Sequence, residues 1–233
     1  MTKDEKLILA LETASPCGGV ALVGEEVYAE ITLASKETYS RRLLQAVEYL
    51  FQQLGVGFDD LAAVAVSIGP GSFTGLRIGL ATAKGLHFAL GLPLIGVETL
   101  KALAMNVLPS PKLICPVLDA RRKQVYTALY HRRGDELEEV IPPSVLSPEK
   151  LLTQIKEPAL FLGDGLRTFG EFLKEGLGEK FEAAPPHLRH LRPANVGVLG
   201  RKRALEGKFD DPLRLLPLYL RPSEAELKRG LPA

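Results

Sequence analysis

The sequence predicts a two-lobed α/β protein. Short apolar runs rich in Val, Ile and Ala alternate with longer segments of helical periodicity, as expected when helices cover sheets. Two of the apolar runs carry one acidic residue near their carboxyl ends, Glu12 and Asp119, and each is followed by a turn and a second strand. Because the two runs lie about half a chain length apart, we interpret them as a duplicated unit. We therefore expect lobes at residues 1–109 and 110–233.

The first lobe is expected to open with a three-stranded meander and a helix. The strands cover residues 7–14, 20–23 and 27–33 and are separated by turn residues. The helix covers residues 40–54, where apolar residues recur every three or four positions on one side, and Gly55 ends it.

A buried strand and a glycine-dotted helix form the centre of this lobe. Residues 62–68 are continuously apolar, as in a strand buried on both faces, and a Gly-Pro-Gly turn ends them. Small residues recur at four-residue spacing along the helix that follows, residues 75–90: Gly75, Gly79 and Ala83. Because glycine inside a helix costs about 1 kcal/mol relative to alanine, we interpret this stripe as the contact for a helix of another protein. Gly79→Arg is then expected to abolish that contact and leave the lobe folded.

The alternation continues to the end of the chain. Further strands are expected at residues 93–97, 113–120, 124–130, 136–141 and 159–162, and further helices at residues 100–107, 149–155, 168–175 and 194–206. A proline-rich link is expected to follow residue 141. Two such halves predict a cleft in which Glu12 and Asp119 face each other, because ligands of open α/β sheets favour the carboxyl ends of strands.

Composition bounds the setting of the protein. The 233 residues carry a net charge of +1, so no field of the whole molecule attracts nucleic acid. Cys17 and Cys115 are the two cysteines, and with no signal peptide in view we expect a reduced, cytoplasmic setting. No apolar run approaches the roughly 20 residues that span a bilayer, so we expect no membrane partner.

Metal and nucleophile motifs are weak. The four histidines form neither H-x-x-x-H nor H-E-x-x-H, and we expect no metal site. Ser67, Ser72 and Thr74 do not fit the G-x-S-x-G pattern of a nucleophile elbow, and no histidine near Cys17 in the sequence activates it. We therefore expect no catalytic residue among them.

Phosphate binding is the open alternative. A glycine-rich loop before a helix N-terminus is a usual setting for an anion, although it lacks the lysine of a Walker A motif. Gly163 and Gly165 form a second candidate loop, and Glu12 and Asp119 could hold Mg²⁺ through water. The candidate residues of the first loop are Gly69, Gly71, Ser72 and Thr74. The competing interpretation is that both loops are sharp turns, in which case no cofactor is required. ATP or ADP is the ligand that would distinguish the two interpretations.

One long segment resembles a known family. SIGPGSFTGLRIGLATAKGLHFALGLPLIGVETL is similar to the most recognisable segment of the bacterial TsaB (YeaZ) family, and ILALETAS, VLDARRKQVYTALY and FLGDG fall where that family has them. The resemblance covers most of residues 6–170. It implies two RNase H-like lobes of the actin/Hsp70/sugar-kinase type, in agreement with the duplication.

The resemblance also implies a function. TsaB-like proteins take part in forming N6-threonylcarbamoyladenosine at position 37 of tRNAs that read codons starting with A. They activate the paralogous enzyme TsaD, which carries a metal-binding H-x-x-x-H, and the ATPase TsaE joins the assembly. In the absence of TsaD they form homodimers, and tRNA is reached through the complex. Many relatives have histidine where this chain has Tyr39, which puts any role that needs an imidazole there in doubt.

We thus expect a partner subunit that binds TsaD through two helices of the first lobe. The expected interface residues are Arg41, Leu44, Val47, Phe51, Gly75, Leu76, Ile78, Gly79, Thr82 and Ala83. The alternative is an ATP-binding phosphotransferase or ATPase that uses Glu12, Asp119 and the two glycine turns. A metallopeptidase, the third alternative, lacks recognisable ligands.

Overall fold

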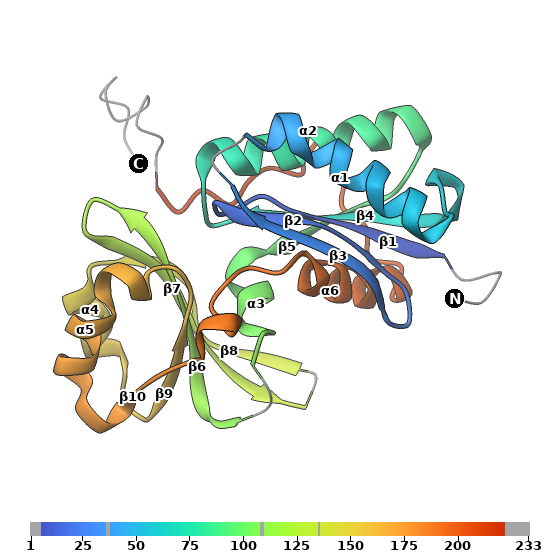
Figure 1. Ribbon diagram of the computed structural model, residues 1–233. Helices are drawn as coiled ribbons and strands as arrows, with labels where there is room; N and C mark the ends of the chain where they lie inside the picture. The colour runs from blue at the N-terminus through green and yellow to red at the C-terminus, as the bar shows by residue number, and fades with distance from the viewer. Residues whose placement is uncertain (1–5, 36–37, 108–109, 135, 222–233) are drawn as a thin grey trace. The chain divides into compact units, whose positions relative to one another are not determined.

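Two five-stranded sheets with the same strand order organise the chain (Figure 1). The computed structural model describes residues 6–35, 38–107, 110–134 and 136–221. The chain divides into two units, each with its own sheet: unit 1 comprises Met1–Ala102 and Leu191–Leu218, and unit 2 comprises Leu103–His190 and Tyr219–Ala233.

The sheet of unit 1 begins with the predicted meander. Its strands are β1 (Leu7–Glu12), β2 (Cys17–Val23), β3 (Val27–Ala34), β4 (Leu61–Gly69) and β5 (Leu94–Glu98), in the order β3-β2-β1-β4-β5. β1 pairs antiparallel with β2 and parallel with β4. Its helices are α1 (Tyr39–Leu54), α2 (Phe73–Leu90), the start of α3 (Thr99–Ala104), α6 (Pro193–Leu205) and the 3₁₀ turn η1 (Phe58–Asp60).

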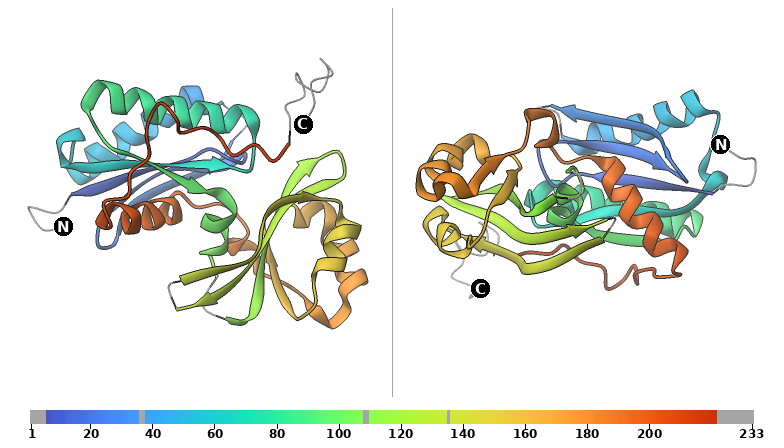
Figure 2. Two further views of the ribbon diagram at one scale, coloured as in Figure 1. Left: turned by 180° about the vertical axis from the view of Figure 1, so that it is seen from behind. Right: turned by 90° about the horizontal axis from the view of Figure 1, so that it is seen from below.

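Side-chain alternation along β1 builds a separate core on each face of this sheet. Leu7, Leu9 and Leu11 point to one face, where they pack with residues of α1 and α2. Ile8 and Ala10 point to the other face, where they pack with residues of α6. Figure 2 shows α6 on the face opposite α1 and α2. Because both faces are covered, the strand sequence is continuously apolar, as the sequence indicated.

The position of α6 corrects the predicted lobe boundary. The expected lobes were residues 1–109 and 110–233, but the chain leaves unit 1 after Ala102 and returns to it at Leu191. Gly197 and Gly200 of α6 face Val23, Ala10 and Ala65 so closely that a Cβ on either would overlap the sheet. Sequence periodicity identified the helix but not the sheet that it covers, because contacts across a hundred residues leave no local pattern.

Unit 2 repeats the topology of unit 1. Its strands are β6 (Ser110–Arg121), β7 (Gln124–Arg133), β8 (Glu136–Leu146), β9 (Ala159–Leu162) and β10 (Phe181–Ala183), in the order β10-β9-β6-β7-β8. β6 pairs antiparallel with β7 and parallel with β9, as β1 does with β2 and β4. The predicted duplication is therefore confirmed.

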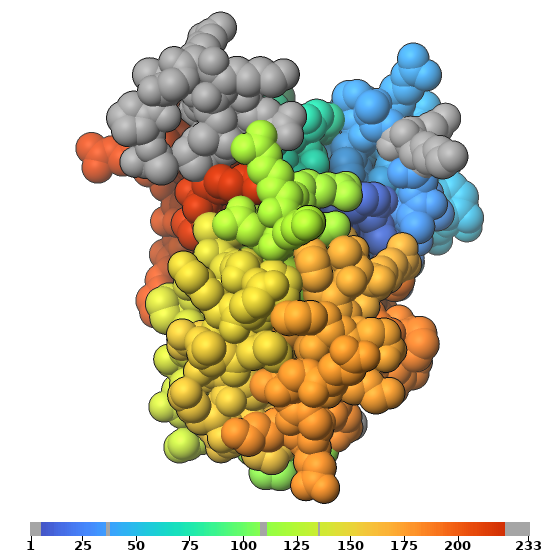
Figure 3. Space-filling view, turned by 90° about the vertical axis from the view of Figure 1, so that its left-hand side faces the viewer, coloured from blue at the N-terminus to red at the C-terminus, as the bar shows by residue number. Residues whose placement is uncertain are grey.

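Helices α4 and α5 cover one face of the second sheet and form a continuous outer surface (Figure 3). The helical elements of this unit are α4 (Pro148–Gln154), α5 (Leu166–Leu177), η2 (Gly178–Lys180) and η3 (Pro186–Leu188). The predicted proline-rich link after residue 141 is wrong: β8 continues through Pro142 and Pro143. Proline is tolerated there because β8 is an edge strand, where one side of the backbone needs no partner.

No helix among the described residues combines the length and the apolar character that crossing a membrane requires.

Candidate functional site

The outward side of α1 and α2 carries several exposed apolar residues of the two predicted interface helices, Leu44 and Phe88 among them. We call this surface the outer face. It consists of Arg41, Leu44, Gln45 and Glu48 on α1 and of Thr74, Arg77, Ile78, Ala81, Thr82, Gly85, Phe88 and Ala89 on α2. At about 100° per residue, the members on each helix fall on a single stripe.

Two large apolar side chains on this surface lack cover. Leu44 is 55% exposed and Phe88 is 66% exposed, and around Gly85 no atom lies within 4 Å of the position that a Cβ would take. Ile78 and Thr82, on the same stripe of α2, are half-buried. The outer face therefore combines two apolar side chains with a small-residue stripe at which another backbone could come close.

The predicted glycine stripe lies on the opposite side of α2. Gly75, Gly79 and Ala83 are buried, and a Cβ on Gly75 or Gly79 would overlap Thr13 in the turn after β1. The interpretation of this stripe as a contact for a foreign helix is wrong: the two glycines let α2 pack against its own sheet. The expectation that Gly79→Arg leaves the lobe folded is wrong for the same reason.

The ten predicted interface residues divide accordingly. Arg41 and Leu44 are exposed, and Ile78 and Thr82 are half-buried. The buried members belong to the core of unit 1 and offer no contact surface in this structure: Val47, Phe51, Gly75, Leu76, Gly79 and Ala83.

The first candidate phosphate loop is tied to its own lobe. Ser72 donates its N–H to the Ala14 carbonyl at 2.6 Å, and Ser72 Oγ accepts the N–H of Gly75 at 3.2 Å, which caps α2. Gly69, with φ of 118°, donates its N–H to Thr99 Oγ1 at 3.1 Å, and Gly71 lies against Ala14. Thr74 is exposed in the first turn of α2. The loop therefore uses several of its donors internally, and its role as a phosphate site stays a prediction.

Glu12 is a buried acid at the end of β1. Its Oε1 accepts the N–H of Ala14 at 2.6 Å, its Oε2 has no hydrogen-bond partner among the described residues, and the residue is fully buried. Burial raises the pKa of the Glu12 carboxyl to about 7, and the hydrogen bond from Ala14 offsets this rise only in part. This carboxyl holds the turn against which α2 begins.

In unit 2 the second candidate loop meets the other strand-end carboxylate. Asp164 Oδ1 accepts the N–H of Asp119 at 3.0 Å, and burial raises the pKa of Asp164. Gly163, with φ of 118°, and Gly165 lie against the backbone of Val117, where a side chain would overlap. These glycines thus let the turn after β9 lie close to the backbone of β6. Glu12 and Asp119 belong to different units, and the expectation that they face each other stays a prediction.

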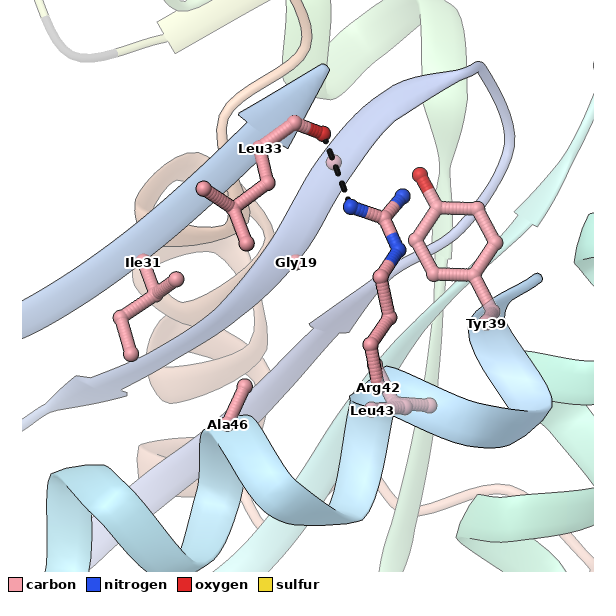
Figure 4. Close-up of a pocket in the computed structure, with 8 residues that line it drawn as sticks. Gly19, Ile31, Leu33, Tyr39, Arg42, Leu43 and Ala46 are labelled. Atoms are coloured by element: carbon pink, nitrogen blue, oxygen red, sulfur yellow. Dashed lines mark hydrogen bonds between the residues drawn. The ribbon is translucent and has the colours of Figure 1, made fainter. Parts of the chain in front are cut away.

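Sequence reasoning missed two features of the site. The exposed residues Ala81, Gly85 and Phe88 could have been found from phase, because Leu76 and Leu80 mark the core side of α2 and the outer residues lie opposite them. Arg42 was also missed. It stands on the apolar side of α1 and extends towards the Leu33 carbonyl, beside the ring of Tyr39 (Figure 4).

Metal ligands do not gather in the described part of the chain: no group of three or more His, Cys, Asp or Glu residues is placed to hold an ion there.

Comparisons with known proteins give a consistent result. A family model described as tRNA N6-adenosine threonylcarbamoyltransferase, TsaD, matches residues 26–229. The protein named tRNA threonylcarbamoyladenosine biosynthesis protein TsaB of Bacillus subtilis is 36% identical over 225 residues, which cover 95% of this chain and 96% of that protein. The protein of the same name in Haemophilus influenzae is 30% identical, with 92% and 93% covered.

Solved structures agree with the sequence relatives. YeaZ from Pseudomonas aeruginosa superimposes with a TM-score of 0.78 at 27% identity, covering 92% of this chain and all of that chain. The ethanolamine utilization protein EutJ from Carboxydothermus hydrogenoformans, with a TM-score of 0.50 at 14% identity, shares the fold alone. Together with the repeated topology, these likenesses confirm the predicted α/β fold of the actin/Hsp70/sugar-kinase type.

Proposed function

This chain belongs to the TsaB (YeaZ) family, and from that premise we propose that it is a non-catalytic partner subunit in the formation of N6-threonylcarbamoyladenosine at position 37 of tRNAs that read codons starting with A. The names of its relatives support the pathway. In this proposal the chain works in the cytoplasm and binds TsaD, TsaE joins the assembly, and tRNA is reached only through the complex.

The observation that carries the proposal is the outer face. Exposed apolar residues that lie together on one surface mark interaction sites, whereas scattered ones do not. Leu44 and Phe88 supply the apolar anchors, and Ala81, Gly85 and Ala89 supply the small-residue stripe. Two adjacent helices of 16 and 18 residues are long enough to pack against a helix pair of a partner.

Two helices of this length can supply the area of a standard interface. A standard stable interface buries about 800 Å² on each partner. We propose a four-helix arrangement in which α1 and α2 pack against the corresponding pair of TsaD. In the absence of TsaD, a second copy of this chain takes the same place, which accounts for a homodimer without a second surface.

Gly85→Arg tests the proposal without disturbing the fold. No atom lies within 4 Å of the Cβ position at Gly85, so the arginine projects outward and blocks close approach. Gly170→Arg is the matched control, because Gly170 lies on α5 of unit 2 and a Cβ there would meet only Leu166 at 3.8 Å. Both variants are expected to fold. Co-purification with TsaD should be lost for Gly85→Arg and kept for Gly170→Arg; equal retention of TsaD by both variants would refute the proposed surface.

The alternative proposal, nucleotide binding by this chain alone, has one observation in its favour. Glu12 Oε2 is buried with no hydrogen-bond partner in the described part of the chain. Glu12 also accepts the N–H of Ala14, whose carbonyl accepts the N–H of Ser72 in the glycine-rich loop. A thermal shift with Mg-ATP separates the two functions, because binding stabilises the folded chain by RT ln(1 + [L]/Kd), about 2.7 kcal/mol at a hundredfold excess over Kd. A clear shift with turnover by the isolated chain would favour the enzyme, and no shift would favour the partner subunit.

A further inference from the structure

The tight hairpin between β6 and β7 in unit 2 carries three consecutive cations, Arg121, Arg122 and Lys123. Arg121 pairs with Gln124 across the two strands, so Arg122 and Lys123 alone form the turn. All three cations are exposed, and the side chain of Arg121 is 75% exposed. The hairpin therefore presents concentrated positive charge to the solvent at the tip of two strands.

The backbone of this hairpin has a conformation that its residue types do not favour. The angle φ is 63° at Arg121, 51° at Arg122 and 58° at Lys123, all in the left-handed region. Among the described residues, these three are the non-glycine positions with positive φ. A two-residue hairpin turn with positive φ at both central residues strongly prefers Asn-Gly, because a long side chain is strained there. Strain that persists in a fold points to a function of the residues that bear it.

Two carboxylates at the base of the hairpin hold this turn in place. Asp119 Oδ1 accepts the N–H of Arg121 at 2.7 Å, and Asp164 Oδ1 accepts the N–H of Asp119 at 3.0 Å. Asp119 Oδ2 also lies 3.6 Å from Nη1 of Arg121. Because asparagine and glycine would form the same turn without strain, the turn itself does not require two cations.

Other charged groups near the hairpin leave a positive excess. Burial raises the pKa of Asp164, while the nearby Arg167 at the start of α5 lowers it. A hydrogen bond from Ser147 lowers the pKa of the exposed Glu149, and Lys123 lowers it further. With Arg167 included, four cations thus lie near three carboxylates, two of which are half-buried. The charge that reaches the solvent at this edge of the second sheet is therefore mainly positive.

We propose that the tip of the β6–β7 hairpin contacts backbone phosphates of tRNA when this chain is bound to TsaD. Exposed Arg and Lys side chains on a turn suit backbone phosphates, and such contacts position a nucleic acid without reading its bases. The identity of the RNA rests on the proposed function, which the names of the relatives support. A net charge of +1 for the whole chain makes a local contact of this kind the one expected.

A turn exchange removes the two turn charges and the strain together. Arg122→Asn combined with Lys123→Gly installs the preferred turn sequence and is expected to raise the urea midpoint of the chain. A loss of tRNA binding in this variant therefore cannot come from unfolding.

Lys174→Gln combined with Lys180→Gln is the matched control. Both lysines are exposed residues of unit 2, and the pair removes the same charge. Lys174 lies in the last turn of α5, and Lys180 directly precedes β10. Because β6 and β10 both run parallel to β9, the start of β10 lies at the edge of the sheet opposite the hairpin.

Fluorescence anisotropy of labelled tRNA, titrated with the preformed complex of each variant with TsaD, measures the contact. Each lost phosphate contact reduces the slope of log K against log salt by about 0.7–0.9. The turn exchange is expected to reduce the slope by about 1.5 and to weaken binding about tenfold or more at roughly 100 mM salt. The control should match wild type in both quantities. An unchanged slope in the turn exchange, or an equal reduction in both variants, would overturn the proposal.

Gel filtration of each variant with TsaD, before tRNA is added, tests the proposed partnership separately. Wild type and both variants are expected to elute together with TsaD. Loss of TsaD by the turn exchange alone would make the hairpin a protein contact and would overturn its role in binding RNA. If wild type does not bind TsaD, the partnership fails, and the same titration with the isolated chain at lower salt decides on the hairpin. There, a smaller slope for the turn exchange than for the control supports the contact, and equal slopes overturn it.

Discussion

One buried ionisable side chain at the start of unit 1, that of Glu12, shows how a single residue sets local structure. Glu12 accepts the N–H of Ala14, whose carbonyl in turn accepts the N–H of Ser72. The carboxyl at the end of β1 is thus linked through one turn to the beginning of α2. Because the residue is fully buried, its charged form is disfavoured in the folded chain.

The stability of the protein is expected to fall as the pH rises from about 4.5 to about 7. In the folded chain Glu12 has a pKa of about 7 and keeps its proton over this range. In the unfolded chain its pKa has the ordinary value of 4.5, so the proton is lost. Each pH unit over which the two states differ by one proton is worth about 1.36 kcal/mol, so the total loss is about 3 kcal/mol. Urea denaturation at pH 5 and pH 8 measures it.

Glu12→Gln is the control for this prediction. The amide keeps the acceptor for the Ala14 N–H and carries no charge at either pH, so this part of the pH dependence should disappear and the variant should be the more stable protein at pH 8. A pH dependence that is the same in wild type and variant would show that Glu12 does not titrate in this range.

Helix α2 shows why a pattern of glycines does not by itself locate an interface. The helix has small residues on both sides: Gly75, Gly79 and Ala83 face the core, and Ala81, Gly85 and Ala89 face outward. The inner glycines are needed because the turn at Thr13 comes against the helix backbone. The outer ones have no such cause within the lobe, and they therefore belong to the proposed contact.

Alanine at two glycines of this helix is expected to act in opposite directions. Gly79→Ala forces a Cβ against Thr13 and should lower the free energy of unfolding by about 1–3 kcal/mol, the usual cost of overpacking. Gly85→Ala meets open space and should raise it by up to about 1 kcal/mol through helix propensity. Urea denaturation of the two variants measures both changes. A stabilised Gly79→Ala or a strongly destabilised Gly85→Ala would contradict the assignment of the two sides.

Local signals predicted most elements and little of the site. The strand at residues 159–162 and the helices around residues 40–54 and 75–90 follow from periodicity, which is a property of neighbours in sequence. The short strand β10 was missed because three residues carry no period. Arg42 and Gly79 were beyond local reasoning, because their roles depend on Leu33, Pro16 and Thr13, which other elements bring to them.

At the scale of the molecule, duplication and a returning segment define the two units. The strand order is the same in both, yet unit 1 is completed only when Leu191–Leu218 comes back to it. Within this segment α6 covers the second face of the first sheet. At the beginning of α6, the Glu30 carboxylate of β3 accepts the N–H of Ala194 at 3.1 Å. The last residue of the segment, Leu218, lies against the same sheet and donates its N–H to the Ile68 carbonyl of β4 at 2.7 Å.

Shortened chains can distinguish the observed units from the predicted lobe boundary at residue 109. Residues 1–109 alone leave the α6 face of the sheet uncovered and are expected to show no cooperative unfolding transition. Residues 1–102 joined to residues 191–218 by a short Gly/Ser linker are expected to unfold cooperatively, because Asn195 Nδ2 donates to the Ala102 carbonyl at 3.0 Å and the two ends lie near each other. Circular dichroism during urea denaturation measures both. Cooperative unfolding of residues 1–109 would contradict the role given to α6.

Site-specific photo-crosslinking to TsaD tests the central claim, that the outer face of α1 and α2 receives the partner, most directly. A photoreactive amino acid replaces Leu44 of α1, which is 55% exposed, or Phe172 of α5, which is 41% exposed and serves as the control. Irradiation of each variant with TsaD is predicted to yield a covalent adduct from position 44 and none from position 172. An adduct from position 172 alone, or from neither position in a mixture that still co-purifies, would contradict the claim.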